Sequence, residues 1–153
     1  MQILEQQTLI LHDLISYRVQ LLPERLPGFI RHCIENIGSL GMRPAGRILF
    51  TDESAAEDGG EKHLEILIPV SPEPVSSAHY QKKTVFKLIN AISARHEGDL
   101  SALARIEKEL LAYAEKKSYQ IITKPYYSIV RLDEDAPGSA IIDIYIGVNY
   151  NIL

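Results

Sequence analysis

The chain has 153 residues, 46% of them hydrophobic and 24% charged, which is the size and composition of one ordinary folded domain. Its formal net charge is −4 and its charges are interspersed, so no long basic stripe attracts a nucleic acid backbone. Cys33 has no disulfide partner within the chain, no secretory leader is visible, and no apolar run approaches a membrane span of about 20 residues. We therefore expect a cytoplasmic protein that binds neither nucleic acid nor membrane.

The first half of the chain predicts a strand, a helix and a hairpin. Residues 7–18 are rich in aliphatic side chains without Gly or Pro, as is typical of a strand. Across residues 24–40, apolar side chains recur at spacings of three and four, which predicts a helix with Pro27 in its first turn and Gly41 as its C-cap. Two extended runs follow, residues 46–51 and 63–70, and the turn residues 58–60 between them predict a hairpin.

The second half predicts the same elements in the same order. After a Pro- and Ser-containing connection, residues 71–79, we expect a strand at 80–95, a helix at 99–117 capped by Asp99, and strands at 119–132 and 139–150. Residues 13–18 align with 90–95 at an offset of 77, and residues 64–70 align with 142–148 at an offset of 78. Such a repeat favours two units that bury their surfaces against each other, although two amphipathic hairpins can look alike without duplication.

The expected core lies between the two helices and one row of each final strand. On the helices, the apolar faces predict Phe29, Ile30, Cys33, Ile37, Leu103, Ile106 and Leu110 as core residues. On the strands, alternation predicts two rows that face the helices, Leu64, Ile66, Ile68 and Val70 in the first half and Ile142, Ile144, Ile146 and Val148 in the second. A thiol on such a stripe is expected to be inert, so Cys33 is assigned to packing.

The second half also carries a family resemblance. Residues 95–98, Arg-His-Glu-Gly, lead into the helix, and the segments 117–121, 125–129 and 141–146 follow it. This arrangement resembles the GyrI-like family, the effector-binding domain of multidrug-responsive regulators, in which a His-x-Gly opens the helix and the last strand alternates aliphatic and acidic residues. Residues 46–50 and 144–148 resemble the strands of a short, stand-alone branch of that family.

The resemblance implies a fold and a binding mode. The implied fold is α+β: one domain over residues 1–153 with two βαββ halves, about 7–70 and 80–150, related by a pseudo-twofold axis. Its antiparallel sheets carry the helices on one side, and a ligand groove lies between the halves. Many drug-binding members carry a Glu and, two residues later, a Tyr at positions that here are Ser128 and Val130. Recognition of lipophilic cations through that Glu is therefore not available to this chain.

Strand alternation and the family pattern together define the candidate site. The rows opposite the helix-facing residues hold an acid in each half, and these rows are either polar anchors in an apolar groove or a solvated outer face. The family pattern adds residues of the preceding strands. The candidate ligand-binding residues are Ile48, Phe50, Glu65, Leu67, Tyr126, Ser128, Asp143 and Tyr145. Arg18 and Arg95, at equivalent strand ends, either pair with the two acids or meet solvent, and we favour solvent.

Signatures of metal, cofactor and nucleophilic chemistry are missing from the sequence. The five His lie in separate elements without metal-ligand spacing, and His96 is expected in the turn before the second helix. There is no nucleophile elbow, phosphate-cradling loop or dinucleotide fingerprint. We expect no cofactor, no metal site and no catalytic residue.

Three functions remain open. The first, which we favour, is a stand-alone binding module, a sensor, carrier or sequestering protein for a small, partly aromatic organic molecule. The second is a protein-interaction or inhibitor-type accessory protein with a protein partner. The third is a hydrolase of strained electrophilic natural products, in which Glu65 or Asp143 would act with Tyr126 or Tyr145 as acid or base.

Overall fold

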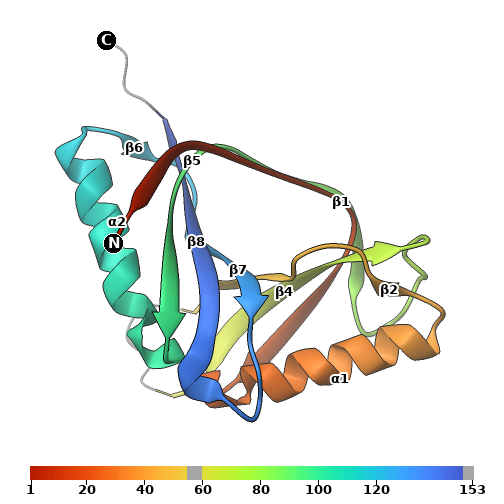
Figure 1. The fold of residues 1–153 in the computed structure, drawn as a ribbon. Coiled ribbons are helices and arrows are strands. Elements are labelled where there is room, and N and C mark those ends of the chain that lie inside the picture. Colours follow the sequence, from red (N-terminus) through yellow and green to blue (C-terminus); the bar gives the residue numbers. More distant parts are fainter. Residues whose placement is uncertain (55–59, 150–153) are drawn as a thin grey trace.

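The computed structural model describes residues 1–54 and 60–149, and it shows an α+β fold in which two helices cover an antiparallel sheet (Figure 1). The strands are β1 (Ile3–Leu21), β2 (Arg43–Pro44), β3 (Leu49–Asp52), β4 (Lys62–Ser71), β5 (Gln81–Gly98), β6 (Gln120–Ile121), β7 (Tyr126–Arg131) and β8 (Ala140–Asn149). The helices are α1 (Leu26–Ser39) and α2 (Leu103–Lys116), with short 3₁₀ helices at Pro23–Arg25, Leu100–Ala102 and Pro137–Ser139. Residues 58 and 59 of the predicted turn, and residue 150 at the end of the last predicted strand, lie outside the described residues.

The predicted order βαββ occurs twice, with a further two-residue strand, β2 or β6, directly after each helix. The offset between the copies is 77 residues up to β3 and β7 and 78 residues at the final strands β4 and β8. Both α helices and the 3₁₀ helices before them are displaced by 77 residues. Unusual backbone conformations recur at the same offset: φ is positive at Asp13 and Asn90 and, after the helices, at Gly41 and Ser118. Because non-Gly residues adopt positive φ uncommonly, these matched positions indicate that the two halves share a backbone conformation.

The strands form a closed circuit. The sheet order is β1-β5-β8-β7-β3-β4, and β4 pairs back with β1, so the long strands β1 and β5 each serve two neighbours (Figure 1). In the β1–β5 pairing Ile10 lies opposite Lys87, and in the β3–β7 pairing Phe50 lies opposite Tyr127. Both pairs join residues 77 positions apart, so the pseudo-twofold axis passes between the members of each pair.

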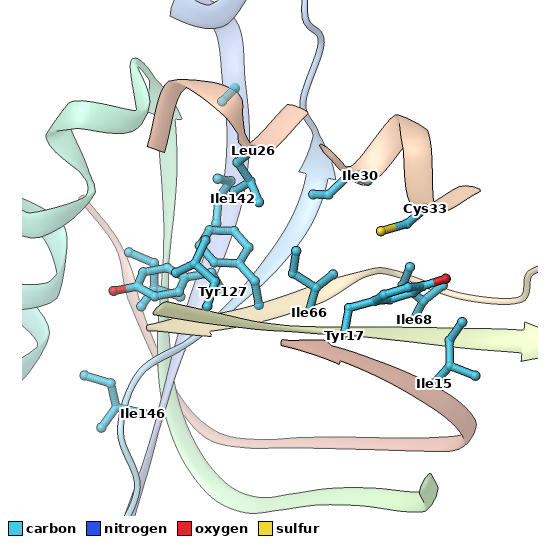
Figure 2. Packing of buried hydrophobic residues seen from close by; sticks show 14 of the residues in the cluster. Ile15, Tyr17, Leu26, Ile30, Cys33, Ile66, Ile68, Tyr127, Ile142 and Ile146 are labelled. Atoms are coloured by element: carbon cyan, nitrogen blue, oxygen red, sulfur yellow. The ribbon is translucent and has the colours of Figure 1, made fainter. Parts of the chain in front are cut away.

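The main core lies between the helices and the outer face of this sheet. Figure 2 shows Ile30 and Cys33 of α1 directed toward Tyr17, Ile66 and Ile68 of the strands. On the other side, Ile106, Leu110 and Ala114 of α2 belong to the same cluster. All eight predicted helix-facing strand residues are buried in this cluster, Leu64, Ile66, Ile68, Val70, Ile142, Ile144, Ile146 and Val148. Phe29 and Leu103 are only half-buried at its margin.

Several predicted boundaries were wrong. The run 119–132 is interrupted by Pro125, which cannot donate a ladder hydrogen bond, and only β6 and β7 remain as strands. The predicted strand 46–51 is instead β3, which begins at Leu49 and ends at Asp52, so Ile48 lies outside the strand. His96 is not in a turn but buried in β5, where its Nε2 lies 2.7 Å from the backbone oxygen of Asp99. Within residues 1–54 and 60–149, no helix is long and apolar enough to cross a membrane.

Candidate functional site

A cavity of about 780 Å³ lies on the helix side of the sheet, where the first turns of α1 and α2 approach each other. Most of its lining comes from both halves at equivalent positions. Residues paired at an offset of 77 are Leu22 with Asp99, Pro23 with Leu100, Glu24 with Ser101, Leu26 with Leu103, Pro27 with Ala104, and Phe50 with Tyr127. The cavity therefore lies on the pseudo-twofold axis and is completed only when the two halves come together.

Two stacked aromatic rings form one wall. The rings of Phe50 and Tyr127 have centroids 4.8 Å apart and are inclined by 16°. Both side chains are largely buried, and Figure 2 shows Tyr127 beside Ile142 and beneath Leu26. Because β3 and β7 pair at these two residues, the sheet itself holds the rings against each other. Such a wall offers a flat apolar surface to an aromatic ligand.

A carboxylate lies directly beside this aromatic wall. The Tyr127 hydroxyl donates a hydrogen bond of 2.8 Å to Oε2 of Glu107, a half-buried residue of α2 that also lines the cavity. Burial and the neighbouring Glu107 carboxylate both raise the pKa of Tyr127. The phenol therefore stays protonated near neutral pH and keeps donating to Glu107, which fixes the carboxylate against the ring.

The charge of the lining is mainly negative. Among the described residues, four acidic residues, Glu24, Asp52, Asp99 and Glu107, line the cavity together with one basic residue, Lys62. Asp99 caps the 3₁₀ helix Leu100–Ala102 rather than α2 as predicted, because α2 begins only at Leu103. Its side chain accepts a hydrogen bond of 2.9 Å from the backbone N–H of Ser101, and this bond holds the pKa of Asp99 below the ordinary value. The surplus of carboxylates favours a cationic ligand over an anionic one.

Six of the eight predicted site residues share the inner face of the strand circuit. Ser128 lies opposite Asp143 and Tyr126 opposite Tyr145 in the β7–β8 register, and Glu65 and Leu67 project from β4 on the same side. They do not form one continuous concavity, because apolar packing fills part of this face. Leu67 belongs to a buried cluster with Leu14 and Leu49, and the Tyr126 ring meets Phe86 edge-on at 4.9 Å.

Glu65 is enclosed by polar partners. Its side chain accepts a hydrogen bond of 2.6 Å from Ser16 Oγ and one of 2.8 Å from Lys83 Nζ, and Arg18 Nη2 lies 3.6 Å away. Burial by itself would raise the pKa of Glu65, but the hydrogen bonds from Lys83 and Ser16 and the positive charges of Lys83 and Arg18 outweigh it and lower the pKa. Glu65 is thus an ionised, internally satisfied carboxylate.

Asp143, the equivalent acid of the second half, is held by two arginines and lines a smaller cavity of about 310 Å³ together with Tyr145. Arg95 and Arg18 thus contact the acids of their own halves. Our preference for purely solvated arginines was wrong, because strand pairing places each arginine directly opposite its acid.

Ile48 and Phe50 were assigned to the wrong face. At the offset of 77, the equivalents of Tyr126 and Ser128 are Leu49 and Thr51, one position beyond the residues we chose. A shift of one residue along a strand reverses the face to which its side chains point. Ile48 packs against the main core, and Phe50 lines the larger cavity on the helix side.

The sequence analysis missed the main features of the larger cavity, Glu107 and Tyr127. One signal was available: Glu107 stands four residues after Leu103, beside the apolar stripe of α2, where a charged side chain must face either solvent or a cavity. The meeting of two helix N-termini is a tertiary feature without a local signal. Among the described residues, no group of three His, Cys, Asp or Glu could hold a metal ion.

Comparison with known proteins identifies the fold. No family model and no curated protein matches the chain, whereas solved structures do. EcmrR in a DNA complex is similar with a TM-score of 0.73 and 14% identity over 98% of this chain, which spans 57% of the EcmrR chain. The EcmrR C-terminal domain alone has a TM-score of 0.68 at 15% identity over 98% of this chain and 97% of that domain.

Two further structures are similar at lower scores. SAV2435 bound to tetraphenylphosphonium has a TM-score of 0.50 at 16% identity, over 97% of this chain and 93% of that one. A hydrolase from Listeria innocua has a TM-score of 0.56 at 9% identity, over 97% of this chain and 91% of that one. At these identities the likeness concerns architecture alone. The chain therefore shares the α+β fold of the EcmrR C-terminal domain and SAV2435.

Proposed function

We propose that the chain is a small-molecule-binding module of the GyrI-like family, and that it takes a partly aromatic, cationic molecule into the cavity between its halves. The observation that carries this proposal is the Phe50–Tyr127 stack with the Glu107 carboxylate fixed beside it. The cavity volume of about 780 Å³ lies in the range of ordinary ligand sites, roughly 300–1,000 Å³.

The chemistry of the lining supports a cation with aromatic groups. Aromatic faces attract both aryl rings and positive charge, and a carboxylate in a partly dehydrated site strengthens that attraction. Tetraphenylphosphonium, the compound bound by SAV2435, belongs to this class and is a suitable probe. In this chain Ser128 occupies the position where many drug-binding members carry Glu, and we assign the anionic role to Glu107 on α2 instead.

Isothermal titration with tetraphenylphosphonium tests the proposal. Glu107→Gln keeps the shape and an acceptor for Tyr127 but removes the charge, and it should weaken binding about 10-fold or more. Glu109→Gln is the matched control, because Glu109 is exposed on the same helix and does not line the cavity. Melting temperatures would verify that both variants are folded.

Two results would contradict the proposal. If Glu107→Gln and Glu109→Gln bound tetraphenylphosphonium with equal affinity, Glu107 would not take part in recognition. If the unaltered chain bound triphenylphosphine oxide, a neutral compound with similar rings, as tightly as tetraphenylphosphonium, the positive charge of the ligand would not be recognised.

A second candidate is hydrolysis, favoured by the contact between Glu107 and Tyr127. Glu107 could accept a proton from an attacking water while Tyr127, whose hydroxyl stays protonated, orients the carboxylate. A protein of this fold from Listeria innocua is described as a hydrolase. Hydrolysis would be established if the chain turned over a strained electrophile such as an epoxide or cyclopropane, and if Glu107→Gln abolished this turnover while Glu109→Gln kept it. Binding of such a compound without turnover would rule out hydrolysis and support only the binding function.

A further inference from the structure

The smaller cavity has a chemistry opposite to that of the larger one. Its volume is about 310 Å³, and it lies on the face of β5 and β8 turned away from α2. Among the described residues, its lining combines the polar or charged side chains of Gln2, Gln7, Ser93, Arg95, Asp143 and Tyr145 with the apolar ones of Leu4 and Ala94. None of these residues lines the larger cavity, so the two sites can be occupied independently.

Two guanidinium groups meet the Asp143 carboxylate. Arg95 and Asp143 line the cavity, and Arg47 reaches Asp143 from beside the lining. Arg95 donates from Nε to Oδ1 of Asp143 at 2.8 Å and from Nη2 to Oδ2 at 3.0 Å, and Arg47 Nη1 donates to the same Oδ2 at 2.7 Å. Asp143 is only 14% exposed, whereas Arg47 and Arg95 are 47% and 49% exposed. Both carboxylate oxygens are thus engaged, while Nη1 of Arg95 and Nε and Nη2 of Arg47 make no bond to Asp143.

This arrangement carries a surplus positive charge. The pKa of Asp143 lies below its ordinary value, because the hydrogen bonds and charges of Arg95 and Arg47 outweigh the effect of burial, so the carboxylate stays ionised and neutralises one arginine. Glu97, the nearest further acid along β5, interacts electrostatically with Arg95, but it is exposed and does not line the cavity. A cation entering here would have to displace an arginine from Asp143, whereas an anion would meet unused guanidinium N–H groups.

Uncharged donors complete the site. Burial, together with the Asp143 carboxylate, raises the pKa of the Tyr145 phenol, so its hydroxyl is protonated and can donate. The side chains of Ser93 and Gln2 provide further donors on the lining. Ser128 lies opposite Asp143 in the β7–β8 register. Its hydroxyl is buried and has no hydrogen-bond partner within the described chain, so this group beside Asp143 is free to form a further hydrogen bond.

The equivalent position in the first half is closed. Glu65 occupies the place of Asp143, but its side chain is only 5% exposed and is bonded to Lys83 and Ser16 as well as lying near Arg18. The Glu65 carboxylate is therefore enclosed by its own partners, whereas the Asp143 carboxylate opens onto the smaller cavity. In the first half Arg18 instead lines a cavity of about 190 Å³ together with Glu53. From this difference and the Arg47–Asp143–Arg95 geometry, we propose that the smaller cavity binds a small molecule through a carboxylate or phosphate group. Arg95 and Tyr145 of the lining would hold this group, and Arg47, bound to Asp143 beside the lining, would add a second guanidinium.

The test uses inorganic phosphate and malonate as probes, each titrated at constant ionic strength into the ¹⁵N-labelled protein. The amides around Arg95 and Tyr145 should shift saturably, with a dissociation constant of roughly 1 mM or tighter for at least one probe. The probe that binds identifies phosphate or carboxylate as the group recognised. Absence of a saturable shift with both probes would overturn the proposal.

Three variants show whether the arginine charge is responsible. Arg47→Gln should weaken binding at least fivefold, whereas Arg131→Gln, an exposed arginine paired with Asp133 elsewhere, should leave it unchanged. Asp143→Asn keeps the shape but frees the guanidinium charge, so it should tighten binding severalfold. Equal binding in Arg47→Gln and Arg131→Gln, or weaker binding in Asp143→Asn, would overturn the proposal. The binding of tetraphenylphosphonium should be the same in Arg47→Gln as in the unaltered chain, which separates this test from that of the larger cavity.

Discussion

Replacing Lys83 by Met should destabilise the fold by about 1–3 kcal/mol at neutral pH, because it removes the nearest positive charge from a buried carboxylate. Lys83 Nζ lies 2.8 Å from Oε2 of Glu65, and the Glu65 side chain is 5% exposed. Breaking a buried ion pair from one side typically costs about 3–5 kcal/mol. We expect less here, since Ser16 still donates to the carboxylate, Arg18 remains 3.6 Å away, and Lys83 is itself 37% exposed.

The pH dependence of this loss distinguishes charge from packing. The folded-state pKa of Glu65 lies below its unfolded value of about 4.3, so the carboxylate stabilises the fold above about pH 4.3 and loses that contribution as the pH falls through the folded-state pKa. Lys83→Met raises the folded-state pKa by removing two of the causes that lower it. The difference between variant and unaltered chain should therefore be largest between about pH 6 and 8 and shrink below about pH 4.

Urea denaturation followed by far-ultraviolet circular dichroism provides the assay, since the chain has no Trp for fluorescence. Arg131→Met is the control, because Arg131 and Asp133 form an exposed pair at 3.1 Å that should contribute less than about 1 kcal/mol. The reasoning would be refuted if Lys83→Met cost no more than this control, or if its cost were the same at about pH 3 as at about pH 7.

Three further predictions concern the core. Leu110→Ala should cost about 2–5 kcal/mol in the same urea assay, because Leu110 is fully buried between α2 and the sheet, and a loss below about 1 kcal/mol would contradict that burial. Gly147→Ala should cost about 1–3 kcal/mol, since the added Cβ would lie 2.7 Å from Cγ2 of Thr123 and 3.0 Å from Cδ1 of Leu88, and an unchanged unfolding free energy would show that these side chains move freely. The Cys33 thiol, whose pKa is raised by burial to about 12, should react with a disulfide reagent at pH 8 only after unfolding, and rapid reaction of the native protein would contradict its placement.

Local patterns were sufficient to predict the fold class and most of the core. The spacing of Ile30, Cys33 and Ile37 identified α1 because a helix buries every third or fourth residue. Alternation placed Ile66 and Ile144 on the helix side, since a strand sends neighbouring side chains to opposite faces. These periodicities depend only on backbone geometry and therefore need no knowledge of partners.

The pairing of distant strands and the larger cavity could not be obtained in the same way. Closure of the circuit depends on β1 pairing with both β4 and β5, a long-range register that no local pattern specifies. A one-residue error in aligning the halves was enough to put Phe50 on the wrong face. Glu107 and Tyr127 meet only because the helix N-termini converge on the pseudo-twofold axis, which is a property of the assembled halves.

A crystal structure of the protein with tetraphenylphosphonium tests the central claim most directly. The account predicts the ligand in the cavity between the halves, with a phenyl ring against the Phe50–Tyr127 stack and the phosphonium within a few ångströms of the Glu107 carboxylate. Tetraphenylphosphonium bound instead beside Asp143 on the opposite face of the sheet, or a cavity that stays empty at saturating ligand, would contradict it.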